Sequence, residues 1–429
     1  MFSIFARNAQ ALGMAATHAV PVVNPVPPPD TATAVFYAHH PPGLPWLVML
    51  ADRVVQPVEF AGRLIALLAT LASALLLADI GTRLSGRDAG FAAGVLALSL
   101  PAGLHHGLLV NYETVAIPGL LLLVRSLALG VGRPWLAGLG AAFADWISLL
   151  PLLLSLRSRP GRRWLGAAIA AGLLTVVTMV LSRTAAPAST SETLAQAVGT
   201  SFLAPDFTWS AWADAMGAHL PALFGWSLLT AALATCVIPL RSPRLRRVLV
   251  WLLVTGVINV VLFGRHATGH EHFSLLLLPF VALGTATLVF PCAELPSGRT
   301  RAGVLALAVL LALGWWQFRE AEPGRTQTHQ AALADAFREV AAEGDVHARP
   351  GGASFVFLHR AARHVLPGPV GGVDGARAAL AAYRDRFGLA GAPGHVALAP
   401  DDAVPAWLAA LGPPVERNGW RFFALLAGD

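Results

Sequence analysis

Polar side chains capable of chemistry gather at the ends of the apolar runs in this sequence. Three carboxylates stand in short turns or bends, where a carboxylate can act as a general base; they are Glu113, Asp145 and Glu271. Imidazole, guanidinium and phenol groups occupy similar places and can hydrogen-bond a phosphate or a sugar; these are Arg7, Tyr37, His39, His40, Tyr112, Arg265, His270 and His272. Ionisable groups are costly beside long apolar runs, so these residues form the candidate site.

Several of these residues also have a purely structural interpretation. Glu113 follows Asn111 and could belong to the cap of the helix that starts there. Asp145 could hydrogen-bond within a helix bundle. His39 and His40 precede two prolines and could form a stiff, solvated loop corner.

Histidines are also candidate metal ligands. The run 265–272 reads Arg-His-Ala-Thr-Gly-His-Glu-His, but within it only His266 and His270 have the i, i+4 spacing of a helical metal pair, and Gly269 lies between them. The pair 105–106 stands at a predicted helix end, where exposure to water accounts for it. We therefore assign no metal ligand, and a divalent cation stays compatible with the pattern.

The composition is that of a polytopic membrane protein. Of the 429 residues, 55% are apolar and 13% are charged, whereas a soluble domain averages about 25% charged residues. A single soluble enzyme and a disordered protein are both excluded. All thirty basic residues are arginine, which excludes Walker-type phosphate binding and Schiff-base chemistry. The arginines stand in short clusters between apolar runs, which does not indicate a nucleic-acid partner.

The apolar runs predict a bundle of membrane-spanning helices, because a span needs about 20 apolar residues. The predicted spans are 62–84, 89–108, 112–131, 163–182, 223–240, 247–264, 273–290 and 301–318. A further run, 134–157, carries Asp145 at its middle and could be one span or a bent hairpin. Cytoplasmic loops collect arginine, and only a hairpin places all of the main arginine clusters on one side. Asp145 is therefore predicted at a bend near a polar cavity on the outer side.

This topology makes a testable prediction. A reporter fused after Arg163 should be cytoplasmic, because the bent hairpin returns the chain to the side that holds the arginines. The measurement is the activity of a fusion that works on only one side of the membrane. A reporter found outside would contradict the hairpin and the predicted place of Asp145.

Composition divides the chain into three predicted regions. Residues 1–60 form an outer-face loop with short interfacial helices, 61–318 form the transmembrane bundle, and 319–429 form a small soluble α/β domain on the outer side. In that domain the predicted strands are 353–359, 395–399 and 420–427, and the predicted helices are 327–343, 375–387 and 401–411. The segment 183–222 is predicted to be a long loop. The fold class is thus an all-α polytopic membrane bundle with a C-terminal α/β domain.

The order of several motifs resembles that of the GT-C glycosyltransferases. The first is Ala6-Arg7-Asn8, a proline-rich loop, Tyr37-Ala38-His39-His40-Pro41-Pro42, and Gly62-Arg63-Leu64 at the start of a long apolar helix. Asn111-Tyr112-Glu113, Asp145-Trp146 and His270-Glu271-His272-Phe273 follow in the same order. The pattern covers roughly residues 1–320 and is similar to the dolichyl-phosphate-mannose-protein mannosyltransferase-like group, which includes the bacterial aminoarabinose transferases.

The resemblance implies transfer of a sugar from a polyprenyl-phosphate donor to a glycan, lipid or protein acceptor at the outer face of the membrane. The donor phosphate would be bound by Arg7, Arg265, His39, His40 and His270, and the acceptor hydroxyl needs a carboxylate as its base. The resemblance also implies the inner membrane of a diderm bacterium, with the C-terminal domain in the periplasm.

In one respect the sequence departs from that group. The family's catalytic aspartate precedes the Ala-Arg-Asn stretch, after a first transmembrane helix, and both are absent from the sequence that starts at Met1. We expect an apolar segment and an acidic residue in frame upstream if the start site lies too late, and otherwise Glu113, Asp145 or Glu271 must supply the base. The family's phosphate-contacting lysine is absent too, and arginine could replace it.

Two other functions are weighed against the transferase. A transporter or flippase of a lipid-linked sugar should show internal repeats and charges at mid-bilayer, and the sequence shows neither. A non-catalytic GT-C-like subunit would be favoured by the missing aspartate, and an upstream stop codon would support it. Neither the sugar nor the acceptor follows from the sequence.

Overall fold

The computed structural model describes most of the chain, in two compact units. The described residues are 2–13, 16–17, 20–22, 24, 26–31, 34, 43–56, 58–107, 109–155, 201–237, 242–290, 297–321, 325–342, 345–349, 363–366, 370–386, 389, 391–400 and 402–426. Contacts group those within 38–183 and 190–322 into one unit, here called the membrane unit. They group those within 1–37 and 323–429 into the other, here called the α/β unit.

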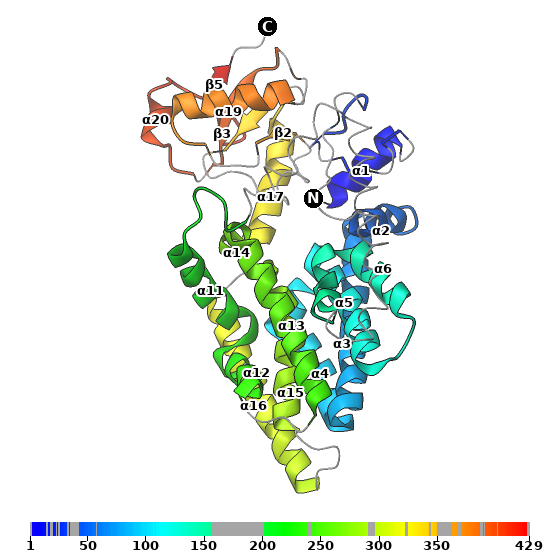
Figure 1. Ribbon diagram of the computed structural model, residues 1–429. Coiled ribbons are helices and arrows are strands. Elements are labelled where there is room, and N and C mark those ends of the chain that lie inside the picture. The colour runs from blue at the N-terminus through cyan, green and yellow to red at the C-terminus, as the bar shows by residue number, and fades with distance from the viewer. Residues whose placement is uncertain are drawn as a thin grey trace. The chain divides into compact units, whose positions relative to one another are not determined.

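The membrane unit consists of helices, and several of the longer ones run in similar directions (Figure 1). In chain order they are α2 (Gly43–Asp52), α3 (Val58–Ser85), α4 (Arg87–Ser99), the π-helical turn η1 (Ala102–His106), α5 (Tyr112–Leu129), α6 (Pro134–Ala144), the 3-10 turn η2 (Trp146–Leu149), α7 (Leu150–Ser155), α11 (Trp209–Phe224), α12 (Trp226–Val237), α13 (Pro243–Leu262), α14 (Gly264–Gly269), the 3-10 segment η3 (Glu271–Leu277), α15 (Leu278–Val289) and α16 (Ser297–Ala321).

Four helical segments among the described residues are long and apolar enough to cross a membrane. They are Phe60–Ser85, Tyr112–Leu129, Pro243–Leu262 and Glu271–Val289, and the number becomes five if the bent pair α11–α12 counts as one span. These segments coincide with predicted spans, and the predicted helical bundle is confirmed. The predicted span 163–182 lies outside the described residues.

Small residues allow the helices of the bundle to pack closely. A Cβ on Gly90 of α4 would collide with Thr82 and with the carbonyl of Ala78 in α3. A Cβ on Gly94, one turn later, would lie 3.0 Å from the carbonyl oxygen of Ala74. Close backbone approach through small residues four apart is typical of helices packed in lipid, where contact rather than water exclusion drives association.

Several predicted spans are broken at specific residues. The run 134–157 breaks at Asp145, where α6 ends and η2 begins, as the sequence predicted. The prediction of a loop over 183–222 was wrong in its last part, because α11 begins at Trp209 after Thr208, whose side chain caps it. α11 and α12 then meet at an elbow of 98° around Gly225, which has a φ of 73°. A positive φ costs glycine little, which permits the sharp bend.

The α/β unit contains a five-stranded mixed sheet. Its elements are α1 (Phe2–Leu12), α17 (Arg325–Val340), β1 (Val346–Ala348), β2 (His364–Val365), α19 (Val373–Arg386), β3 (Gly394–Leu398), α20 (Ala406–Ala409), β4 (Val415–Arg417) and β5 (Trp420–Leu426). The strand order is β2-β1-β3-β5-β4. β1 pairs in parallel with β2 and β3, whereas β5 is antiparallel to β3 and β4.

Helices cover both faces of this sheet. Along β5, Trp420 and Phe422 join the cluster of α17, whereas Phe423 and Leu425 join the cluster of α19, following the two-residue period of a strand. Figure 1 shows α19 lying across the strands. The predicted strands 395–399 and 420–427 and the helices 327–343 and 375–387 are confirmed. Of the predicted helix 401–411, the described residues form a helix only at α20, which is shorter than predicted. The predicted strand 353–359 lies outside the described residues.

Candidate functional site

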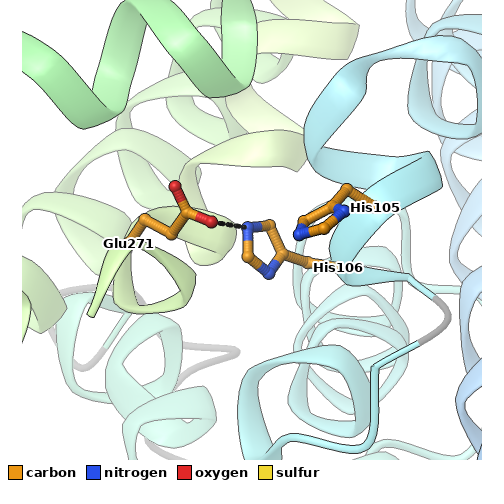
Figure 2. Close-up of side chains that lie close together, drawn as sticks. All are labelled: His105, His106 and Glu271. Carbon is orange, nitrogen blue, oxygen red and sulfur yellow. Dashed lines mark ion pairs between the residues drawn. The ribbon is translucent and has the colours of Figure 1, made fainter. Parts of the chain in front are cut away.

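A carboxylate and a buried imidazole meet between two short irregular helices of the membrane unit. The Nε2 atom of His106 lies 3.2 Å from Oε1 of Glu271. His106 ends η1 and Glu271 begins η3, and the two segments are in contact. Figure 2 shows the side chains of His105, His106 and Glu271 pointing toward one another. Glu271, predicted as a candidate base, therefore has an imidazole partner 165 positions earlier in the sequence.

Imidazole rings continue from this pair along the start of η3. The rings of His105 and His106 have centroids 4.8 Å apart, and His106 lies 6.5 Å from His272. His270 is 5.4 Å from His272 and also 5.4 Å from His266. These five residues are called the histidine cluster below. The predicted site residues His270 and His272 both belong to it.

The backbone around His106 is held by two threonines. Thr114 Oγ1 at the start of α5 donates a hydrogen bond to the carbonyl of His106, with a distance of 3.1 Å. Thr70 Oγ1 in α3 donates to the carbonyl of Gly107, with a distance of 2.9 Å. π-Helical turns are rare and often occur at functional sites. Gly103 is required in this one, because a Cβ there would collide with the carbonyl of Ala97.

The other half of the site is fixed by α13. Asn259 is buried there, and its Nδ2 atom donates to the carbonyl of Phe273 with a distance of 2.8 Å. The Phe273 ring packs against Phe263 at 5.8 Å and against His266 at 5.5 Å. An amide inside an apolar helix is costly unless it is hydrogen-bonded, so this bond anchors the start of η3 to the bundle.

The surroundings of His270 favour the neutral form of its imidazole. Burial, and then the charge of nearby His219, lower the pKa of the His270 imidazole below its ordinary value of 6.5. A neutral imidazole can accept a hydrogen bond or bind a metal, whereas a protonated one can do neither at that nitrogen. The neutral ring is therefore suited to accepting a hydrogen bond or coordinating a cation, and it is a weaker base than an exposed imidazole.

The two other candidate carboxylates have different surroundings. Asp145 is buried and caps η2, since its Oδ1 atom accepts a hydrogen bond from the backbone N–H of Ile147 at 3.3 Å. Glu113 is buried in the first turn of α5, next to the buried Tyr112. The cap of α5 is Asn111, whose Oδ1 atom accepts from the Thr114 N–H at 2.7 Å. Glu113 is thus not the capping residue.

The arginines predicted to bind phosphate lie in different units. Arg265 is half-exposed in α14 of the membrane unit and forms an ion pair with Asp206, with Nη2 and Oδ2 2.7 Å apart. An exposed pair of this kind is worth at most about 1 kcal/mol, so an anionic ligand can displace Asp206. Arg7 belongs to α1 of the α/β unit, and burial lowers its pKa below the ordinary value. The predicted residues Tyr37, His39 and His40 lie outside the described residues.

His105 and His106 were not among the predicted site residues. A His-His pair at a helix end is compatible with simple exposure to water, yet the His106 side chain is only 3% exposed. One local signal could have identified the two histidines as candidates. Pro101 interrupts the predicted span 89–108 shortly before the histidine pair and Gly107. With Glu271, the pair offers three potential ligand atoms that all lie within 4.8 Å of one another.

The fold of the chain is that of the two ArnT structures compared below. The model of the family described as "Dolichyl-phosphate-mannose-protein mannosyltransferase" matches residues 39–184. The predicted resemblance and the fold class are confirmed, and the chain is a membrane protein.

Two crystal structures of ArnT from Cupriavidus metallidurans are similar to the chain over its whole length. The apo structure has a TM-score of 0.60 at 14% sequence identity, and it covers 100% of this chain and 94% of the other. The structure bound to undecaprenyl phosphate has a TM-score of 0.61, with the same identity and coverage. Among curated proteins, none matches the sequence significantly.

Proposed function

We propose that the protein is an integral-membrane glycosyltransferase that moves a sugar from a polyprenyl-phosphate donor to an acceptor at the outer face of the membrane. The observation that carries the proposal is the likeness of the whole chain to ArnT, which was also solved with undecaprenyl phosphate bound. The transmembrane helices provide the apolar surroundings that a long polyprenyl tail requires. The host membrane is proposed from the resemblance, which points to the bacterial inner membrane and a periplasmic α/β unit.

The chemistry needs one base and a way to hold a phosphate. In a single displacement, the acceptor oxygen forms a bond to the anomeric carbon while the bond between that carbon and the phosphate oxygen breaks. The acceptor proton passes to a carboxylate, and polyprenyl phosphate leaves with the electron pair. Glu271 is the best-placed candidate base, because it lies beside His106 at the end of the bundle and keeps 28% of its side chain exposed. Glu113 and Asp145 are the alternatives.

Cationic and neutral hydrogen-bond donors would hold the phosphate. Arg265 can exchange its Asp206 partner for a phosphate oxygen. The resemblance assigns phosphate binding to Arg7, His39 and His40 as well. His270, His272, Tyr37 and Tyr112 would complete the binding of donor and acceptor. A transporter is less favoured, because the ionisable residues of the site lie at helix ends rather than at mid-span.

His40→Ala should abolish sugar transfer while leaving membrane insertion intact, because His40 precedes Pro41 and Pro42 in the sequence and the resemblance assigns it to binding of the donor phosphate. The measurement is transfer from a radiolabelled polyprenyl-phosphate sugar in proteoliposomes that contain the purified protein. Amounts of inserted protein are compared by carbonate extraction. Transfer by His40→Ala at the wild-type rate would contradict the assigned role of His40. A wild-type protein that transfers no sugar would contradict the proposed function.

A further inference from the structure

We propose that His105, His106 and Glu271 form a binding site for one divalent transition-metal ion of the zinc type. Each residue offers one ligand atom, and all three atoms lie within 4.8 Å of one another. The inference concerns a metal site and does not depend on the transferase proposal; in the ion-bound protein Glu271 is a ligand, and the role of free base falls to Glu113 or Asp145.

The geometry of the three residues is close to what zinc requires. In a tetrahedral site with bonds of roughly 2.0–2.1 Å, neighbouring ligand atoms lie about 3.4 Å apart. Nε2 of His106 and Oε1 of Glu271 are already 3.2 Å apart. The ligand atom of the less buried His105 lies within 4.8 Å of these two atoms, so its ring must move toward them when an ion binds.

His106 gives an independent reason to expect a ligand. Its side chain is only 3% exposed, and neither Nδ1 nor Nε2 makes a regular hydrogen bond to a described residue, although Nε2 lies 3.2 Å from Oε1 of Glu271. A buried imidazole without full hydrogen bonding is costly, and metal coordination at Nε2 would replace what the ring loses on leaving water. The backbone of His106 is held by Thr114, so the ring is already positioned before any ion binds.

The donor set selects the class of ion. Two imidazole nitrogens and one carboxylate suit zinc and its transition-metal neighbours, whereas magnesium and calcium prefer oxygen ligands. Three protein ligands leave a fourth position open to water or to an oxygen of a bound molecule, as in catalytic rather than structural zinc sites. The pair His266 and His270, which has the spacing of a helical metal pair, is the competing location within the same cluster.

Metal binding by the purified full-length protein in detergent tests the inference directly. After removal of metal with a chelator, titration with zinc should show one tight site for each chain. Cobalt(II) should bind in its place and give the intense visible absorption of a four-coordinate ion. His106→Ala and the nearly isosteric Glu271→Gln should each weaken zinc binding by about 100-fold or more, since each removes one of three ligands. Magnesium should not compete.

His266→Ala is the matched control, because it removes a neighbouring imidazole of the same cluster that is not in the proposed set. It should bind zinc with unchanged affinity. Thermal unfolding of the metal-free variants shows whether each one is folded. If His106→Ala does not fold, Glu271→Gln still tests the ligand set. The inference would be overturned if the wild type did not bind zinc, if Glu271→Gln left zinc binding unchanged, or if His266→Ala abolished it.

Discussion

Glu271→Gln should lower the rate of sugar transfer by about 100-fold or more, which is the contribution expected of a positioned general base. Glutamine keeps the size of the side chain and can still accept a hydrogen bond from His106, so the contact between η1 and η3 is preserved. It cannot take a proton from the acceptor hydroxyl. The fold should therefore remain while the chemical step is lost.

The measurement is single-turnover transfer with saturating donor, which separates chemistry from product release. Asp214→Asn is the matched control, because Asp214 is an exposed carboxylate on α11 with no assigned role in the site. It should transfer sugar at the wild-type rate. A Glu271→Gln protein with undiminished transfer would exclude Glu271 as the base and leave Glu113 and Asp145 as the candidates.

Acid should destabilise the α/β unit through His347. This residue on β1 is fully buried among the rings of Phe337, Phe422 and His395. Burial first, and then the charges of His395, Arg363 and His364, lower the pKa of its imidazole from 6.5 to about 3. As the pH falls, the His347 imidazole is therefore protonated near pH 6.5 in the unfolded chain but only near pH 3 in the folded unit.

The sign of the effect follows from that difference in bound protons. The free energy of unfolding is greatest above pH 6.5 and should fall by up to about 1.4 kcal/mol for each pH unit below it, levelling off near pH 3. His364, whose pKa is lowered to about 4 mainly by burial, adds a smaller part of the same sign.

Hydrogen exchange of β3 and β5 in the full-length protein measures this, after correction for the pH dependence of intrinsic exchange. His347→Leu should flatten the loss of protection between pH 6 and pH 4, because leucine is apolar and does not titrate. Glu416→Gln, which alters an exposed side chain on β4, should leave the profile of the wild type unchanged. An equal pH dependence in His347→Leu and the wild type would contradict the role of His347.

Local patterns in the sequence predicted most of the helices correctly. Apolar runs of sufficient length gave the spans that begin near Phe60, Tyr112 and Pro243, and the helix break at Asp145 lies where Asp145 and Trp146 interrupt an apolar run. The alternation of apolar residues gave β3 and β5. Each of these features depends on neighbours within a few residues, which is the range over which periodicity carries information.

The parts that were missed depend on contacts between distant residues. His106 meets Glu271 across 165 positions, and Arg265 pairs with Asp206 across 59. No local pattern indicates either contact. β1 and β2 were missed because strands of three and two residues are too short for alternation to be visible. The π-helical turn at His106 could not be distinguished from an ordinary helix end.

The elbow between α11 and α12 has a consequence for how deeply the protein sits in its bilayer. Trp209 begins α11 and Trp226 begins α12, and their side chains are 56% and 55% exposed. Exposed tryptophans on a membrane protein settle at the level of the lipid headgroups. Trp209 stands at the end of α11 that packs on α13, where Trp212 of the same helix donates a hydrogen bond to the carbonyl of Val260. We therefore expect the Trp209 indole to hold this end of α11 near the lipid headgroups, within reach of a donor whose tail stays in the hydrocarbon.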